Sequence, residues 1–302
     1  MGTLVTIHVV RPHADDAIER AFGWFREIER RCSRFDDQSE LMQLTMNVGE
    51  AVTASPILFE AVRFALSVAE ETDGAFDPTV GHRMEARGFN REDRTGRTVR
   101  TPVPPDVDIS YRDVEVDAAR RTIRLHRPLL LDLGAVAKGL AVDAAARELQ
   151  PFTDFAIDAG GDLYLGGLNP RREPWSVGIR HPRIDRELID SVRVSDKAVC
   201  TSGDYERIVV QSRHDRRAES DRVRCATAES EHHILDPRTG ASPGGVASVT
   251  VVGPNALLAD ALATAAFVLG PAEGLRLLER HGVEGLILTP ALERVETSGL
   301  PR

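Results

Sequence analysis

Cysteine is scarce in this chain of 302 residues, and its three copies, Cys32, Cys200 and Cys225, are odd in number. Their spacing matches no zinc site, no redox pair and no disulfide framework. We therefore expect three reduced thiols, in the core or at the surface.

Long hydrophobic runs and an excess of positive charge are also missing. No apolar run reaches about 18 residues, no signal-peptide pattern opens the chain, and no cysteine near the start could carry a lipid. The net charge of −9 argues against general binding to nucleic acid or to a membrane surface. The sequence as given predicts a cytoplasmic protein with no membrane span, and export stays open if the natural start lies upstream.

The composition is that of an ordinary globular protein. Hydrophobic residues make up 42% of the chain and charged residues 28%. A chain of this length can bury a large core, as a single domain over 1–302 or as two closely packed lobes with a boundary near residue 150.

Hydrophobic periodicity predicts several helices. A strand over residues 4–10 is followed by an amphipathic helix that carries Ile18, Phe25 and Cys32 on one side. A second helix begins at Ser55-Pro56, where the serine can cap and the proline fits the first turn, and it ends near Gly74. A third is expected over residues 136–149.

Short strands outnumber these helices and do not alternate with them. Residues 114 and 123–125 predict a hairpin, and an apolar run over 128–132 follows it. Further strands are expected at residues 155–158, 163–165, 175–180, 191–194, 208–211, 233–236 and 247–252. This order favours an α+β fold with antiparallel-rich mixed sheets and packed helices. The polar segments 88–108 and 212–231 are expected to form a surface connection and a solvated hairpin tip.

Asp260 and Thr264 lie four residues apart in an otherwise apolar stretch, residues 256–269, so they share one helix face. A carboxylate in an apolar setting needs a cation, a donor or a solvated cleft. A metal that prefers hard oxygen ligands would satisfy both side chains. Alternatively, Thr264 bonds back to the Asp260 carbonyl while Asp260 faces solvent.

Two further segments could contact an anion or a ligand. In Asp132-Leu-Gly-Ala-Val-Ala-Lys-Gly139, a predicted strand leads into a helix, whose free N–H groups can face a phosphate beside Lys138. It is no P-loop, since Lys138 precedes Gly139 and no Ser or Thr follows. A surface lysine on an ordinary turn explains it equally well. Asp77 in Ala75-Phe-Asp-Pro-Thr-Val-Gly81 projects from a turn, and an ordinary turn again suffices.

Asp158-Ala-Gly-Gly-Asp162 is a glycine-rich turn that would suit a close approach of the backbone to a ligand, or any hairpin. In His232-His-Ile-Leu-Asp236, strand alternation would place His233 and Leu235 on one face. A neutral imidazole could act there as a general base on a hydroxyl. A structural histidine pair is the alternative.

Taken together and in this order along the chain, the motifs resemble those of the ApbE family of flavin transferases. They are Met1-Gly-Thr, Phe35-Asp-Asp-Gln-Ser-Glu-Leu41, Ala75-Phe-Asp-Pro-Thr-Val-Gly81, Asp132-Leu-Gly-Ala-Val-Ala-Lys-Gly139, Asp158-Ala-Gly-Gly-Asp162, Thr201-Ser-Gly-Asp-Tyr-Glu-Arg207, His233-Ile-Leu-Asp-Pro-Arg-Thr-Gly240 and Ala259-Asp-Ala-Leu-Ala-Thr264. The resemblance runs from Met1 to about Thr289 and implies a T-fold-like architecture.

The resemblance implies a Mg²⁺-dependent FAD:protein FMN transferase. Such an enzyme splits the FAD pyrophosphate, attaches FMN to a Thr or Ser hydroxyl of an acceptor protein and releases AMP. The Mg²⁺ ligands would be the main-chain oxygen of Ala135 and the side chains of Asp260 and Thr264. FAD contacts would fall on Met1, Phe35, Ala75, Phe76, Asp77, Asp132, Lys138 and Leu235, and His233 would act in the transfer.

Two other functions remain compatible with the same residues. One is a Mg²⁺-dependent FAD pyrophosphatase that yields FMN and AMP, which differs only in the absence of an acceptor protein. The other is a noncatalytic flavin-binding protein, although simple storage would not require Asp260, Thr264 and His233 together.

Overall fold

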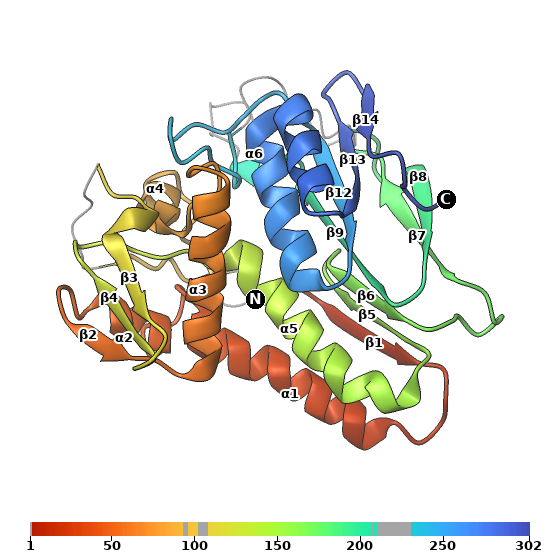
Figure 1. The fold of residues 1–302 in the computed structure, drawn as a ribbon, viewed down its shortest axis with the longest axis horizontal. Coiled ribbons are helices and arrows are strands. Elements are labelled where there is room, and N and C mark those ends of the chain that lie inside the picture. The colour runs from red at the N-terminus through yellow and green to blue at the C-terminus, as the bar shows by residue number, and fades with distance from the viewer. Residues whose placement is uncertain (1, 93–95, 102–107, 207, 210–230) are drawn as a thin grey trace.

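The computed structural model describes residues 2–92, 96–101, 108–206, 208–209 and 231–302. Its main sheet has seven strands in the order β1-β5-β6-β9-β12-β13-β14, and each neighbouring pair is antiparallel (Figure 1). The strands are β1 (Val5–Val9), β5 (Phe155–Ala159), β6 (Leu163–Gly166), β9 (Lys197–Gly203), β12 (Ser248–Gly253), β13 (Glu284–Leu288) and β14 (Arg294–Glu296). The predicted α+β fold with antiparallel sheets is confirmed.

In the described residues, three smaller sheets accompany it. One has the order β2-β4-β3, and two are pairs, β7-β8 and β10-β11. Their strands are β2 (Ala51–Thr53), β3 (Val114–Asp117), β4 (Thr122–Leu125), β7 (Trp175–Arg180), β8 (Leu188–Val194), β10 (Ile208–Val209) and β11 (Glu231–His232). Val116 pairs with Ile123 in the β3-β4 hairpin, as the sequence predicts.

The helices are α1 (Asp15–Cys32), α2 (Glu40–Thr45), α3 (Pro56–Glu71), α4 (Gly81–Ala86), α5 (Gly134–Leu149) and α6 (Ala256–Arg280). The described part of the chain also has short 3₁₀ turns, which are η1 (Pro78–Val80), η2 (Tyr111–Asp113) and η3 (Gln150–Phe152). At the start of α3, the Ser55 hydroxyl accepts a hydrogen bond from the Leu58 amide. The predicted cap of this helix is therefore confirmed.

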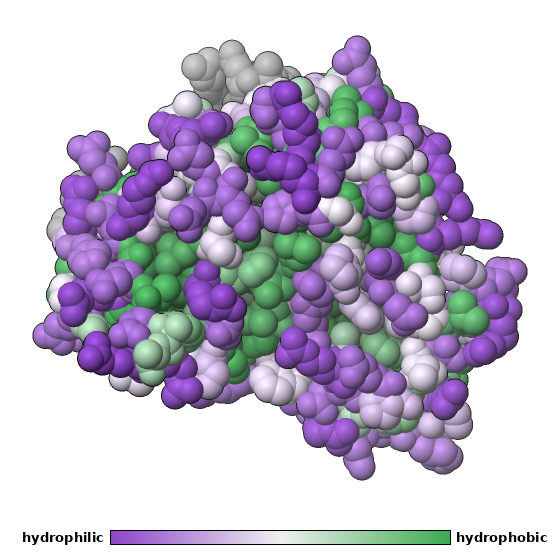
Figure 2. Space-filling model, viewed as in Figure 1, coloured by the Kyte–Doolittle hydropathy of each residue, from purple (hydrophilic) through white to green (hydrophobic). Residues whose placement is uncertain are grey.

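The core lies where α5 and α6 cover the large sheet, with α1 packed on α5 (Figure 1). α5 packs between α1 and α6, and α6 in turn contacts β9 and β12. The buried hydrophobic cluster there includes Phe25, Val142, Ile157 and Phe267, so it joins residues from both sides of position 150. Figure 2 shows hydrophilic residues over most of the same face, with hydrophobic residues visible in its middle.

Helix α6 is interrupted within its length. Gly270 has a φ of 83°, a conformation that glycine adopts readily, and Pro271 follows, so the chain kinks between two helical segments.

By length and composition α6 could cross a membrane, with a mean hydropathy of 1.4 over its most apolar window. In this fold 56% of that window is buried, and α6 packs in the core.

The expectation of a strand at 128–132 is wrong. Leu129, Leu130 and Leu131 are fully buried, but their segment lies in none of the sheets of the described structure. Its backbone bonds to the region of α4, where the Gly81 amide donates to the Leu130 carbonyl at 3.1 Å and the Asp132 amide donates to the Pro78 carbonyl at 2.7 Å. The apolar run is thus a buried extended connection.

The strand expected at 233–236 is also wrong, because β11 ends at His232 and a turn begins soon after. The Asp236 carboxylate accepts a hydrogen bond from the Arg238 amide at 2.9 Å, and the Gly240 amide donates to the Asp236 carbonyl at 2.7 Å. The expected alternation fails as well, since Leu235 is buried beside the buried Ile234.

Some expectations fall partly or wholly outside the described residues. The hairpin tip expected at 212–231 lies outside them, except for Glu231, and so does Cys225. Within the segment 88–108, the described residues Asn90 and Val99 are buried and joined by a hydrogen bond of 2.8 Å. Gly88, Arg91, Arg97, Thr98 and Arg100 around them are exposed, so the described part of the segment lies at the surface and is anchored by these two buried residues.

Candidate active site

The candidate site forms where α5 crosses the beginning of α6. Gly139 allows this crossing, because a Cβ there would lie 2.5 Å from the Ala256 carbonyl oxygen and 2.7 Å from the Leu257 Cα. Four residues later, the Asp143 carboxylate accepts hydrogen bonds from the Ala256 amide at 2.7 Å and the Leu257 amide at 2.9 Å. These charge-assisted bonds cap α6 and fix its first turns against α5.

Lys138 and two aspartates form a cluster at this crossing. The Lys138 ammonium donates a hydrogen bond to the Asp162 carboxylate, and its Nζ lies 3.8 Å from Asp260 Oδ2. The side chains of Asp162 and Asp260 are 1% and 6% exposed, whereas that of Lys138 is 27% exposed. The cluster is therefore buried at its acidic end and reaches solvent at the lysine.

Burial dominates the electrostatics of this cluster. Burial raises the pKa of Asp260, as does the neighbouring Asp162, while Lys138 and the Gly139 amide lower it, and the balance leaves this pKa raised to about 7. Burial by itself would lower the pKa of Lys138, but the carboxylates of Asp162 and Asp260 outweigh it, so the Lys138 pKa is raised. Lys138 is thus a firmly charged cation.

Asp260 also has an oxygen with unused bonding capacity. Among the described residues, its buried Oδ2 has no hydrogen-bond partner, although Lys138 lies close by. One turn later, the Thr264 hydroxyl lies 3.2 Å from the Ser202 hydroxyl of β9. The alternative in which Asp260 faces solvent is wrong, because the residue is buried.

A cation could use this oxygen-rich surface. Within the described part of the chain, no group of three His, Cys, Asp or Glu side chains is arranged to hold a metal. A candidate set must therefore combine the Asp260 carboxylate with hydroxyl or main-chain oxygens. Ala135 lies half-buried in the first turn of α5, one turn before Lys138.

A second cluster surrounds Asp132, just before α5. Its Oδ1 accepts a hydrogen bond from the Gly134 amide at 2.8 Å, and its Oδ2 accepts one from Arg34 Nε at 2.6 Å. The Arg34 guanidinium also lies 4.2 Å from the centre of the half-buried Phe35 ring. Asp132, Phe35 and the start of the Lys138 helix are therefore joined by short contacts.

The Asp77 carboxylate accepts hydrogen bonds from its own turn and from the start of η2. Its Oδ1 accepts hydrogen bonds from the Thr79 amide at 2.8 Å and the Thr79 hydroxyl at 2.7 Å, and its Oδ2 accepts one from the Tyr111 amide at 2.9 Å. Burial raises the pKa of this carboxyl, and the hydrogen bonds oppose that shift. Ala75 and Phe76 just before it are buried in the core.

His233 and Leu235 lie on the segment that follows β11. His233 is half-buried and Leu235 is buried. The segment is tied to α4 because Arg83 donates a hydrogen bond to the Pro237 carbonyl. The neighbouring His232 is buried, and its ring centroid lies 5.4 Å from that of Phe267 in a T-shaped arrangement. His232 therefore packs in the core. Met1 lies outside the described residues.

The glycine-rich turn approaches another part of the protein closely. Gly160 has a φ of 69°, and a Cβ there would lie 1.8 Å from the Thr3 hydroxyl oxygen. The turn therefore brings Thr3 and the buried Asp162 to one place. A ligand is not needed to explain its glycines.

Four supporting residues were not predicted from the sequence, namely Arg34, Asp143, Asp162 as a partner of Lys138, and Ser202. Each acts on a segment far away in the chain, and local spacing carries no signal for such pairs. A charged residue inside or beside a motif could have indicated such a partner, as Asp162 does at the end of the glycine-rich turn.

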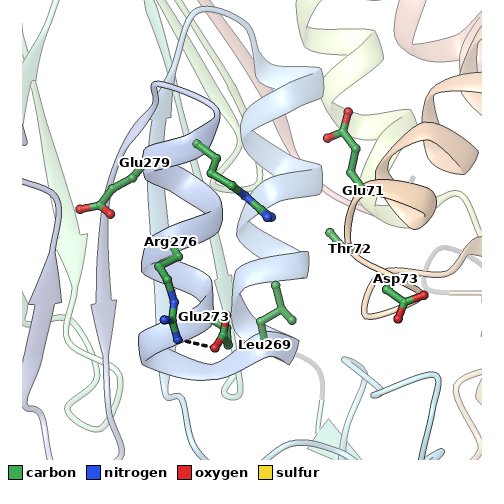
Figure 3. A pocket seen from close by; sticks show the side chains of 8 residues that line it. Glu71, Thr72, Asp73, Leu269, Glu273, Arg276 and Glu279 are labelled. Carbon is green, nitrogen blue, oxygen red and sulfur yellow. Dashed lines mark hydrogen bonds and ion pairs between the residues drawn. The ribbon is translucent and has the colours of Figure 1, made fainter.

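One cavity of about 570 Å³ lies elsewhere, between the end of α3 and the second half of α6 (Figure 3). It is lined by Glu71, Thr72, Asp73, Leu269, Glu273, Arg276, Glu279 and Arg280. None of the predicted site residues that the structure describes lines it. Its acids and arginines pair in part with each other, as Arg276 does with Glu273.

Comparison with known proteins gives a consistent result. The family model described as ApbE family matches residues 1–287. A FAD:protein FMN transferase of Treponema pallidum is 33% identical over 96% of this chain and 83% of the relative. One from Vibrio cholerae is 30% identical over 87% of this chain and 76% of the relative.

Solved structures agree with these relatives. The ApbE protein of Thermotoga maritima aligns with a TM-score of 0.82 and 29% identity, over 98% of this chain and 94% of that one. The flavin transferase ApbE of Vibrio cholerae aligns with a TM-score of 0.79 and 26% identity, over 99% and 94% of the two chains.

Proposed function

The chain belongs to the ApbE family, and from this membership and the geometry of its site we propose that it is a Mg²⁺-dependent FAD:protein FMN transferase. It would move FMN from FAD to a Thr or Ser hydroxyl of an acceptor protein and release AMP. The relatives named above carry the name of this activity, and the alignments cover most of both chains.

The observation that supports the proposal most is the cluster of Lys138, Asp162 and Asp260. A pyrophosphate brings two adjacent negative charges, and an ammonium that is firmly charged and partly open to solvent can neutralise them. Lys138 also lies near the N-terminal end of α5, where the helix dipole favours negative charge. The amides of Gly134, Val136 and Ala137 there already donate to Asp132 and Leu133, so Lys138 and the dipole would be what attracts the anion. A dinucleotide with a pyrophosphate is the ligand class that suits both features.

The residues present fit a magnesium ion. Asp260 has a buried oxygen with no hydrogen-bond partner in the described structure, and Thr264 offers a hydroxyl on the same helix face. With the main-chain oxygen of Ala135, they would supply the hard oxygen ligands that Mg²⁺ prefers. When bound, Mg²⁺ would neutralise phosphate charge and polarise the phosphorus centre.

The protein's own residues would then position the groups and move the proton. The acceptor hydroxyl oxygen forms a bond to the FMN phosphorus, and the bond from that phosphorus to the bridging oxygen breaks. AMP leaves with the bridging oxygen. His233 would take the hydroxyl proton as a general base, while Lys138 would hold the phosphate charge. Asp162 would keep Lys138 in place through its hydrogen bond.

The test uses the full chain with FAD, Mg²⁺ and candidate acceptor proteins, followed by the intact mass of each acceptor and the amount of AMP released. The proposal predicts an FMN adduct on a Thr or Ser together with an equal amount of AMP. AMP and free FMN without an adduct would indicate the pyrophosphatase, and bound but intact FAD would indicate a flavin-binding protein.

A variant separates binding from transfer. His233→Ala should still bind FAD, but it should transfer roughly 10²–10⁴-fold more slowly, which is the usual effect of a positioned general base. His281→Ala is the matched control, because it removes a partly buried imidazole that pairs with Glu71. Normal transfer by His233→Ala, or a complete loss of FAD binding, would remove His233 from the role of base.

A further inference from the structure

Arg34 is a buried arginine that follows Ser33, the residue that caps the end of α1. Its side chain is only 5% exposed. Arginine is rarely buried to this extent unless each part of the guanidinium has a partner. Here Nε donates to Asp132 Oδ2 at 2.6 Å, Nη2 donates to the Phe89 carbonyl at 2.5 Å, and the guanidinium lies 4.2 Å from the centre of the Phe35 ring.

These contacts join three segments that are distant in the sequence. Asp132 is 98 residues from Arg34, and Phe89 is 55 residues away. The Asp132 carboxylate that receives Arg34 also accepts from the Gly134 amide, the first residue of α5. Leu133, at the cap position of this helix, makes no side-chain cap bond. The chain of contacts from Arg34 through Asp132 therefore fixes the first turn of the helix that carries Lys138.

We propose that Arg34 is a positioning residue for FAD, which acts through Asp132 to hold the start of α5 and through stacking to hold the Phe35 ring. The inference rests on the proposed function. Arg34 would touch neither the reacting phosphorus nor the acceptor hydroxyl, so its effect should fall on FAD binding.

The contacts require an arginine. The planar guanidinium donates in two directions and stacks on a ring at the same time, whereas a lysine ammonium is a single charged point without a face. A lysine at this position would retain the charge opposite Asp132. It would lose the bond to the Phe89 carbonyl and the stacking on Phe35. The exchange therefore tests geometry separately from charge.

The primary experiment measures FAD dissociation constants by quenching of flavin fluorescence, with steady-state kinetics and thermal unfolding alongside. For Arg34→Lys we expect FAD affinity and KM to weaken by about 10-fold to 100-fold, the usual range for residues that orient a binding group, while kcat changes by less than about threefold. The unfolding temperature should stay close to that of the wild type.

Arg31→Lys is the matched control. Arg31 lies in the last turn of α1, three residues before Arg34. Its ion pairs go to Glu27 at 2.8 Å and Glu40 at 2.9 Å rather than to Asp132. FAD affinity should be unchanged in this variant. If Arg34→Lys and Arg31→Lys bind FAD equally well, or if Arg34→Lys lowers kcat alone, the proposal is wrong.

A double variant tests the route through Asp132. Arg34→Gln removes the charge opposite Asp132, so if Arg34 acts by holding this carboxylate, the affinity loss of Arg34→Gln should not add fully to that of Asp132→Asn. Full additivity would overturn the route. Wild-type protein that fails to bind FAD would instead refute the proposed function, so the two failures are distinguishable.

Discussion

Replacing Lys138 by methionine removes a charge from the centre of the site while keeping most of the apolar stem. The variant leaves Asp162 and Asp260 buried without their shared cation. Removing one partner of a buried ion pair costs about 3–5 kcal/mol, because the remaining charge has lost its compensation. We therefore expect the free energy of unfolding to fall by about that amount in a buffer at about pH 8 without Mg²⁺.

The loss should depend on pH in a defined direction. The pKa of Asp260 is already raised to about 7 with Lys138 present, and Lys138 lowers it, so the variant should have a still higher value. A carboxyl with a raised pKa in the folded state binds a proton on folding, and the stability it provides is lost as the pH rises through that pKa. The deficit of the variant should therefore be larger at about pH 8 than at about pH 6.

Adding Mg²⁺ gives a second test of the same variant. If Asp260 belongs to a cation site, Mg²⁺ should restore part of the lost stability, in proportion to the logarithm of its concentration above the dissociation constant. Urea unfolding followed by circular dichroism measures the loss of stability, its dependence on pH and its recovery with Mg²⁺. The chain has only one other lysine, the exposed Lys197, so Lys197→Met is the matched control. A Lys138→Met protein as stable as this control at pH 8 would refute the reasoning.

Three further predictions concern the same region and the core. Asp260→Ala should leave the fold intact but abolish nearly all Mg²⁺-dependent turnover, and unchanged activity across a Mg²⁺ titration would exclude Asp260 from the site. Gly139→Ala places a Cβ against backbone atoms of α6, so it should cost about 1–3 kcal/mol and weaken FAD binding; Gly23→Ala, where a Cβ meets open space, should be neutral or stabilising. Burial lowers the pKa of both His82 and His232 in the folded protein. As the pH falls, the unfolded chain therefore binds protons at these histidines at a higher pH than the folded protein does. Stability in urea should therefore fall by up to about 1.4 kcal/mol per pH unit per histidine below about pH 6.5, and His232→Gln should reduce that slope.

Features that depend on neighbouring residues could be predicted from the sequence. The serine cap of α3, the amphipathic α1 and the β3-β4 hairpin all follow from local periodicity and local hydrogen bonding. The same holds for Asp260 and Thr264, since a spacing of four places both on one helix face. Their placement in a buried setting is consistent with the apolar residues around them.

Features that depend on distant contacts could not be predicted in this way. The apolar run 128–132 was expected to be a strand, but its backbone partners are Pro78 and Gly81, about 50 residues earlier. The pairing of Lys138 with Asp162 and of Arg34 with Asp132 requires the fold itself, because nothing near each residue marks its partner. At His233, the turn formed by Asp236 ends the strand that the apolar pattern favoured.

A crystal structure of the full chain with FAD and Mn²⁺, used as an anomalous scatterer in place of Mg²⁺, tests the central claim most directly. We expect an anomalous peak bounded by the Asp260 carboxylate, the Thr264 hydroxyl and the Ala135 carbonyl oxygen, with the FAD phosphates beside Lys138. A peak elsewhere, or FAD bound in the cavity between α3 and α6 with Lys138 still closed on Asp162 and Asp260, would contradict it.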